Sequence, residues 1–126
     1  MIRARTKLTP ASTQTREQLL LTGERLIAEQ RFDKVSLRQI NTAAGQRNSS
    51  AAHYHFGSKE ALITAIYEYR MGRVNVRRIG LLAAMPPANG PRPVISMIEI
   101  LIYPMIEEVE SSEGGHHYIQ FLSQLF

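Results

Sequence analysis

The stretch from Asn48 to Phe56 carries side chains that suit contacts with a nucleic acid. A short helix over residues 49–56 would pack Ala51, Ala52 and Phe56 inward. Its exposed face would then consist of Asn48, Ser49, Ser50, His53 and Tyr54. Small and polar groups of this kind suit hydrogen bonds with base edges and phosphates. The pattern therefore predicts a nucleic-acid contact surface on this segment.

Two neighbouring elements must position this surface. Apolar residues at helical spacing predict a helix from about Thr15 to Gln30. A second helix is predicted to begin at Ser36, whose hydroxyl forms a capping box with Gln39, and to end at Gly45. Together with the short helix at 49–56, these elements predict a helix-turn-helix domain over residues 15–58.

The remaining segments predict an all-α chain in further parts. Residues 1–14 form a basic arm without an apolar period, and residues 59–85 a long linking helix capped by Ser58. Residues 86–93 contain four prolines and cannot be helical. Residues 86–126 are then expected to be a partial helical regulatory domain. In it, Val94–Val109 would be a helix buried on all sides, and Glu107–Gly115 a solvated acidic loop.

Charge is distributed unevenly along the chain. Residues 1–78 carry a net charge of +8, from 14 of the 15 lysines and arginines and six acids. Residues 79–126 carry a net charge of −4, from one arginine and five glutamates. A basic front half is typical of proteins that bind polyanions, because each neutralised phosphate releases condensed counterions.

Composition narrows the class of protein. The 126 residues include no cysteine, which excludes disulfides and thiolate metal sites and fits a cytoplasmic protein. The longest apolar run, Val94–Ile106, is interrupted by Glu99 and Pro104 and is shorter than the roughly 20 residues that cross a bilayer. The sequence contains no glycine-rich phosphate loop and no nucleophile elbow, so an enzyme is not expected.

The segments LIAEQRFDKVSLRQINTAAG and AAHYHFGSKEALITAIYE resemble the DNA-binding domain of TetR-type (tetracycline-repressor-like) bacterial regulators. The resemblance extends from about Thr15 to Tyr69. It implies a homodimer that places two helices in successive major grooves of a double-stranded operator. It also implies a helical ligand-binding and dimerising domain, which this chain would supply only in part.

The resemblance assigns roles to particular residues. Arg38 matches a basic residue that contacts bases, and Ser36 matches a phosphate-contacting position. His53 and Tyr54 match an aromatic pair lying along the DNA backbone, and Lys59 matches a phosphate-contacting lysine. The turn is one residue longer than the common family pattern. The DNA-binding residues expected are Ser36, Arg38, Gln46, Arg47, Asn48, Ser49, Ser50, His53, Tyr54 and Lys59.

The rear half offers candidates for an effector site. An apolar lining with one tyrosine hydroxyl would suit a hydrophobic small molecule, although the same residues could equally be core. The candidates are Met97, Leu101, Tyr103, Met105 and Phe121. Two histidine pairs, His53 with His55 and His116 with His117, lack a third ligand at a recognisable spacing, so neither a metal nor a cofactor is expected.

These observations predict a sequence-specific DNA-binding transcriptional regulator, which would be a ligand-responsive dimeric repressor. Two alternatives remain open from the sequence. One is a basic helical interaction module that binds an acidic protein or a membrane surface. The other is a truncated remnant that does not dimerise.

Overall fold

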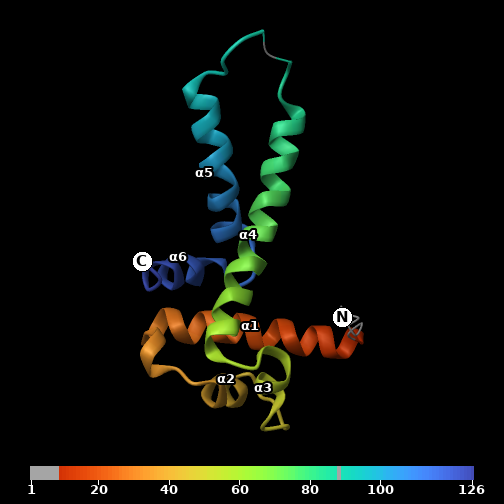
Figure 1. The fold of residues 1–126 in the computed structure, drawn as a ribbon, viewed down its shortest axis with the longest axis vertical. Coiled ribbons are helices and arrows are strands. Elements are labelled where there is room, and N and C mark those ends of the chain that lie inside the picture. The colour runs from red at the N-terminus through yellow and green to blue at the C-terminus, as the bar shows by residue number, and fades with distance from the viewer. Residues whose placement is uncertain (1–8, 88) are drawn as a thin grey trace, which may run out of the picture.

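A computed structural model describes residues 9–87 and 89–126, and within these residues the fold is helical, without a strand (Figure 1). The prediction of an all-α protein is confirmed. The elements are α1 (Pro10–Gln30), the 3₁₀ turn η1 (Phe32–Lys34), α2 (Leu37–Ala43), α3 (Ala51–Phe56), α4 (Lys59–Ala84), α5 (Val94–Ser111) and α6 (Gly115–Ser123).

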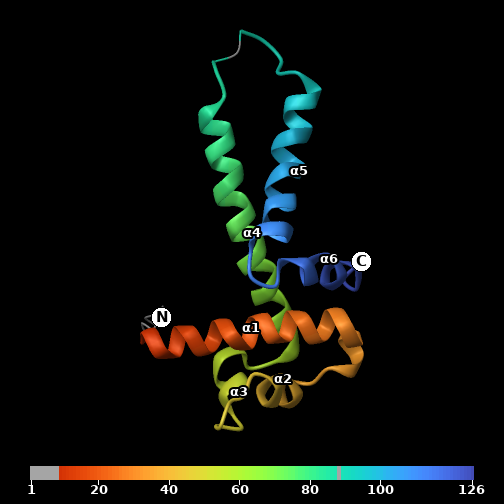
Figure 2. The ribbon, with the colours of Figure 1, turned by 180° about the vertical axis from the view of Figure 1, so that it is seen from behind.

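The helices form a head at one end of an elongated molecule (Figure 1). The head comprises α1, η1, α2 and α3, and α4 runs away from it to pair with α5 in an antiparallel hairpin. Helix α6 then lies back beside α1, as both views show (Figure 2). We call α5 and α6 together the body. The body therefore contacts the head directly, as well as through α4.

Local capping signals explain where α2 and α4 begin. At α2, the Gln39 backbone N–H donates to Ser36 Oγ at 3.1 Å, and the Ser36 N–H donates to Gln39 Oε1 at 2.8 Å. At α4, the Ala61 N–H donates to Ser58 Oγ at 3.1 Å. These bonds satisfy amides that a helix start leaves unpaired. The predicted starts of α2 and α4 are confirmed.

Helix α1 begins earlier than the sequence predicted. It starts at Pro10, and the Ser12 N–H donates to the side chain of Thr9 at 3.2 Å. Proline fits the first helical position because its missing N–H is not needed there. Residues 10–14, expected in the basic arm, are thus helical, and residues 1–8 lie outside the described residues. The apolar period gave the wrong start because only the later turns of α1 are buried.

The main core lies where the head meets α6. Helix α6 contributes Tyr118 and Phe121, both fully buried. Phe121, which was expected to line an effector pocket, packs in this core. The buried cluster consists of Leu19, Leu20, Leu26, Ile27, Val35, Leu37, Ile40, Ala51, Ala52, Leu62, Ile66, Tyr118 and Phe121.

Helix α5 is much more exposed than the sequence predicted. It packs against α4 and α6, and its buried residues are Ile100, Pro104 and Glu108. The other faces of α5 are exposed because α4 and α6 are the helices that pack against it in the described residues. Its exposed apolar residues are Val94, Ile95, Met97, Ile98, Leu101, Ile102, Tyr103 and Ile106. Despite this composition, none of the helices in the described ranges is long and apolar enough to cross a membrane.

Candidate nucleic-acid interface

Four of the predicted DNA contacts surround one shallow depression on the head. Ser36 and Arg38 come from the start of α2, His53 from α3 and Lys59 from the start of α4. Ser36, Arg38 and His53 are exposed, and the neighbouring Tyr54 leaves 74% of its surface in solvent. Three helices thus bring together hydroxyl, guanidinium, imidazole and ammonium groups that are separated in the sequence. Such a set can donate hydrogen bonds to an anion.

Lys59 has partners inside the protein that the sequence did not predict. Its Nζ donates to the backbone oxygen of Phe32 at 2.9 Å and lies 4.3 Å from the centroid of the Phe32 ring. These contacts hold η1 against the start of α4. The ammonium group therefore stabilises the rim of the depression as well as adding positive charge there.

The turn before α3 places its polar residues in different environments. Arg47, Ser49 and Ser50 are exposed, whereas Gln46 is half-buried. Asn48 is exposed, but its Oδ1 accepts the Ser50 N–H at 2.9 Å. The side-chain oxygen of Asn48 thus orders the turn, and α3 begins at Ala51 instead of Ser49.

Helix α3 is also held from the side of α1. The Arg16 guanidinium lies 4.9 Å from the centroid of the Phe56 ring, and His55 is half-buried beside it. Burial and the charge of Arg16 lower the pKa of His55 below its ordinary value of 6.5. His55 is therefore neutral at neutral pH, and its contribution is to packing.

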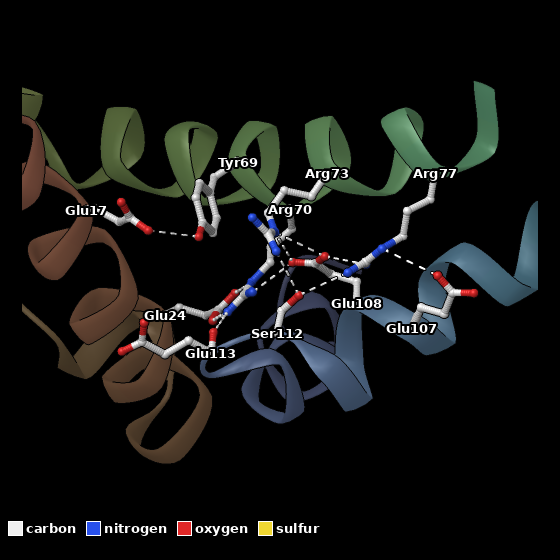
Figure 3. A network of polar contacts seen from close by, with 10 residues as sticks. All are labelled: Glu17, Glu24, Tyr69, Arg70, Arg73, Arg77, Glu107, Glu108, Ser112 and Glu113. Atoms are coloured by element: carbon white, nitrogen blue, oxygen red, sulfur yellow. Dashed lines mark hydrogen bonds and ion pairs between the residues drawn. The ribbon is translucent and has the colours of Figure 1, made fainter. Parts of the chain in front are cut away.

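A buried cluster of charges joins the head to the body (Figure 3). Arg70 of α4 is fully buried, and its Nε donates to Glu24 Oε2 of α1 at 2.8 Å. Its Nη1 donates to Glu108 Oε1 of α5 at 2.9 Å, and its Nη2 donates to the backbone oxygen of Glu113 at 2.8 Å. One guanidinium therefore holds carboxylates from both parts of the molecule.

Two further arginines of α4 complete the cluster around Glu108. Arg73 Nε lies 3.0 Å from Glu108 Oε1, and Arg77 Nη1 lies 2.6 Å from Glu108 Oε2. Burial alone would raise the pKa of Glu108, but hydrogen bonding by Arg70 and the charge of Arg73 outweigh it, so the pKa is lowered. We call Glu24, Arg70, Arg73, Arg77 and Glu108 the ionic node.

The ionic node corrects two expectations from the sequence. Glu108 was expected in a solvated acidic loop, yet it belongs to α5 and is fully buried. Arg70, Arg73 and Arg77 were counted in the basic front half, yet they pair with acids inside the protein. The positive charge that can face a polyanion is therefore smaller than the sequence count suggested.

A second polar contact fixes the body on the head. Gln124, which follows α6, accepts the Phe32 N–H at its Oε1, 2.7 Å away. Its Nε2 donates to the backbone oxygen of Ile27 in the last turn of α1. The Ile27 oxygen also accepts the Arg31 N–H at 3.1 Å, so Gln124 adds a second donor there and supplies the acceptor for the first amide of η1. Phe32 is held through its N–H by Gln124 and through its carbonyl by Lys59.

The predicted effector residues do not gather in one cavity. Met97, Leu101 and Tyr103 are exposed on α5. Met105 instead lines an apolar groove between α5 and α6, and Tyr103 borders a separate hollow near the end of α4. The groove is lined by Ile102, Met105, Ile106, Val109, Glu110 and Ile119. Across the described residues, no three potential metal-ligating side chains come together.

Sequence reasoning missed Asn41, Glu24, Glu108 and Gln124. For two of them a signal was present. Asn41 follows Leu37 by four residues and so lies on the buried face of α2, and Glu24 follows Leu20 in the same way on α1. A polar residue at a core position indicates a buried hydrogen-bonding role. Nothing in the sequence indicated which partners Glu108 and Gln124 would meet.

A capped α2, a turn and a short polar α3 packed across α1 define a helix-turn-helix DNA-binding domain. Residues 19–66 match the family described as bacterial regulatory proteins, tetR family. The matched segment lies within the residues whose sequence resembles the DNA-binding domain of TetR-type regulators, and it supports that prediction. No curated protein matches the chain.

Proposed function

We propose that this chain acts as a dimeric repressor that binds operator DNA and is released by a small hydrophobic effector. One observation carries the DNA-binding part of the proposal. Ser36, Arg38, His53 and Lys59 surround one depression beside the exposed Tyr54. In this proposal α3 and the turn before it enter the major groove. The depression then faces a phosphate strand, and the Arg38 fork reads guanine.

The response to an effector requires the head to follow the body. The ionic node supports this step, because Arg70 bonds to Glu24 of the head and to Glu108 of the body at the same time. Moving the head away from the body would break the buried ion pairs of Arg70 with Glu24 or Glu108, which is strongly unfavourable. In this proposal the head and body therefore move together. An effector releases DNA when it binds more tightly to a conformation whose heads do not fit the operator than to the conformation that binds DNA.

Exposed apolar surfaces support the dimer and the effector site. The uncovered face of α5 exposes several large apolar side chains, including Val94, Ile98 and Leu101, and contiguous apolar surface of this kind marks interaction sites. A second copy of the chain would cover it. The apolar groove between α5 and α6 suits a hydrophobic ligand, with Glu110 as its charged neighbour.

The test is a selection of duplexes from a random library by the unmodified chain, followed by titration of the selected duplex. Arg38→Ala should weaken binding about tenfold and relax the base preference, because one base-contacting fork is lost. Arg38 is exposed, so its loss should not unfold the head. Arg92→Ala is the matched control, because Arg92 lies in the loop between α4 and α5.

Two results would contradict this proposal. The first is a selection that enriches no duplex. The second is an Arg38→Ala variant that binds the selected duplex as tightly as the unmodified chain does. Salt-sensitive binding without any preference among duplexes would favour the other class considered from the sequence, a basic interaction module.

A further inference from the structure

Asn41 of α2 is a buried polar residue whose amide bonds two separate parts of the helix-turn-helix. Its side chain and backbone together leave 3% of the residue exposed. Its Nδ2 donates to the backbone oxygen of Asn48 in the turn at 2.8 Å. Its Oδ1 accepts the backbone N–H of Ala52 in α3 at 2.9 Å. One side chain therefore fixes the turn and the start of α3 relative to α2.

Apart from the packing of Ala51, Ala52 and Phe56, the segment that Asn41 holds depends on hydrogen bonds for its position. Helix α3 has six residues, too few to be stable by its own hydrogen bonds. The turn from Ala44 to Ser50 is longer than the three or four residues usual in this motif, and a longer turn has more conformations to choose from. The Gln46 N–H adds one bond to the backbone oxygen of Asn41 at 3.2 Å.

Replacing the amide would leave partners buried without a bond. The Ala52 N–H lies at the start of α3, where no helical carbonyl precedes it to accept its hydrogen bond. An unpaired buried amide is costly, so α3 would shift until its groups found water. Arg47, Ser49 and Tyr54, which are exposed on the same segment, would shift with it.

We propose that Asn41 is a positioning residue that sets the register of α3 against α2 and thereby the base preference of the head. Asn41 does not touch DNA in this role, because both ends of its amide are bonded inside the protein. The inference rests on the proposed binding of operator DNA by the head. It assigns to Asn41 a share of specificity and leaves non-specific attraction to the exposed cations.

The test compares two variants on two duplexes. Asn41→Ala removes both bonds, whereas Asn41→Asp keeps an acceptor for the Ala52 N–H and loses the donor to Asn48. The duplexes are one that the unmodified chain selects from a random library and a scrambled one of the same composition. Asn75→Ala is the matched control, because Asn75 is exposed on α4 away from the head.

For both Asn41 variants, the ratio of the two dissociation constants should fall about tenfold or more, as when a base contact is lost. Affinity for the scrambled duplex should stay within about twofold, because phosphate attraction is independent of the register. Asn75→Ala should change neither value. A ratio that stays constant overturns the inference, and so does an equal loss on both duplexes, which would indicate a general loss of structure.

Hydrogen exchange on the unmodified chain keeps the inference testable even if Asn41→Ala does not fold. The Ala52 amide should exchange much more slowly than that of the exposed Ser49, and free exchange at Ala52 would overturn the inference. The two failures are distinguishable. A selection without enrichment rejects the proposed function, whereas enrichment with an unchanged ratio in the Asn41 variants rejects the role of Asn41 alone.

Discussion

Arg38 and Arg70 are the same type of residue in opposite surroundings. Arg38 is exposed on the head, beside the depression formed with Ser36, His53 and Lys59. Arg70 is fully buried in the ionic node and makes four hydrogen bonds to Glu24, Glu108 and Glu113. The first can bind a partner from outside the molecule, whereas the second is committed to holding the molecule together.

The comparison separates two effects that a count of charges combines. A substitution on the head surface should change binding and leave the free energy of unfolding nearly unchanged, because exposed side chains lose little on replacement. A substitution in the ionic node should change the free energy of unfolding first, because the remaining buried charges lose part of their pairing. The following predictions test this separation.

The largest effect is expected for Arg70→Met. The substitution leaves Glu24 buried without the arginine it pairs with and removes one of the three arginines bonded to Glu108, which should cost about 3–5 kcal/mol of the free energy of unfolding. Urea denaturation followed by circular dichroism measures this. Arg78→Met is the control, because Arg78 donates to backbone oxygens of α5 instead of a buried carboxylate. Equal losses in the two variants would contradict the special role of the node.

A smaller loss in the free energy of unfolding is expected when the pH is lowered into the acid range. The pKa of Glu108 in the folded chain lies below its ordinary value of 4.5, so the unfolded chain binds a proton first as pH falls. The contribution of Glu108 is therefore complete above about pH 4.5 and is lost as pH falls through the lowered pKa. The loss should be smaller than for Arg70→Met because the protonated side chain still fills its site.

Glu108→Gln is the matched variant for the acid experiment. It keeps the size of the side chain and removes its titration. The part of the acid-induced loss that belongs to Glu108 should disappear from its unfolding curves measured across the acid range. An unchanged dependence on pH in this variant would show that other groups cause the loss.

The smallest loss of stability is expected for Lys59→Met. Lys59 combines both roles, because it bonds inside the protein and also lines the depression on the head. The variant loses the bond from Nζ to the Phe32 carbonyl, which should cost about 1 kcal/mol. It also loses a cation beside the depression, so affinity should fall about equally for all duplexes and the salt slope by about one. Urea denaturation and titrations at several salt concentrations measure the two losses. An unchanged slope would restrict Lys59 to its contact with Phe32.

Features that depend on neighbours in the sequence were predictable. The capping box of Ser36 with Gln39 and the cap at Ser58 were found because their partners lie three residues apart. The matched family segment, residues 19–66, likewise contains local signals of a helix-turn-helix. The grouping of Ser36 and Arg38 with His53 and Lys59 came from the family resemblance, and the depression now gives it a common location.

Features that depend on distant partners were not predictable. Arg70 and Glu24 are 46 residues apart, and no spacing rule pairs them. The exposure of α5 could not be inferred either, because the apolar pattern of a helix does not say how many neighbours will cover it. Position on the buried face did mark Asn41 and Glu24 as unusual, although it did not identify their partners.

The return of α6 to the head has a consequence for the order of folding. Tyr118 and Phe121 complete the core of the head, and the contact of Phe32 with Gln124 joins residues 92 positions apart. Chains grow from the N-terminus during synthesis, so α1 to α4 leave the ribosome before the helix that covers their apolar residues. Until α6 has been synthesised, part of the apolar core of the head remains exposed to solvent. Contacts this distant in sequence also slow folding.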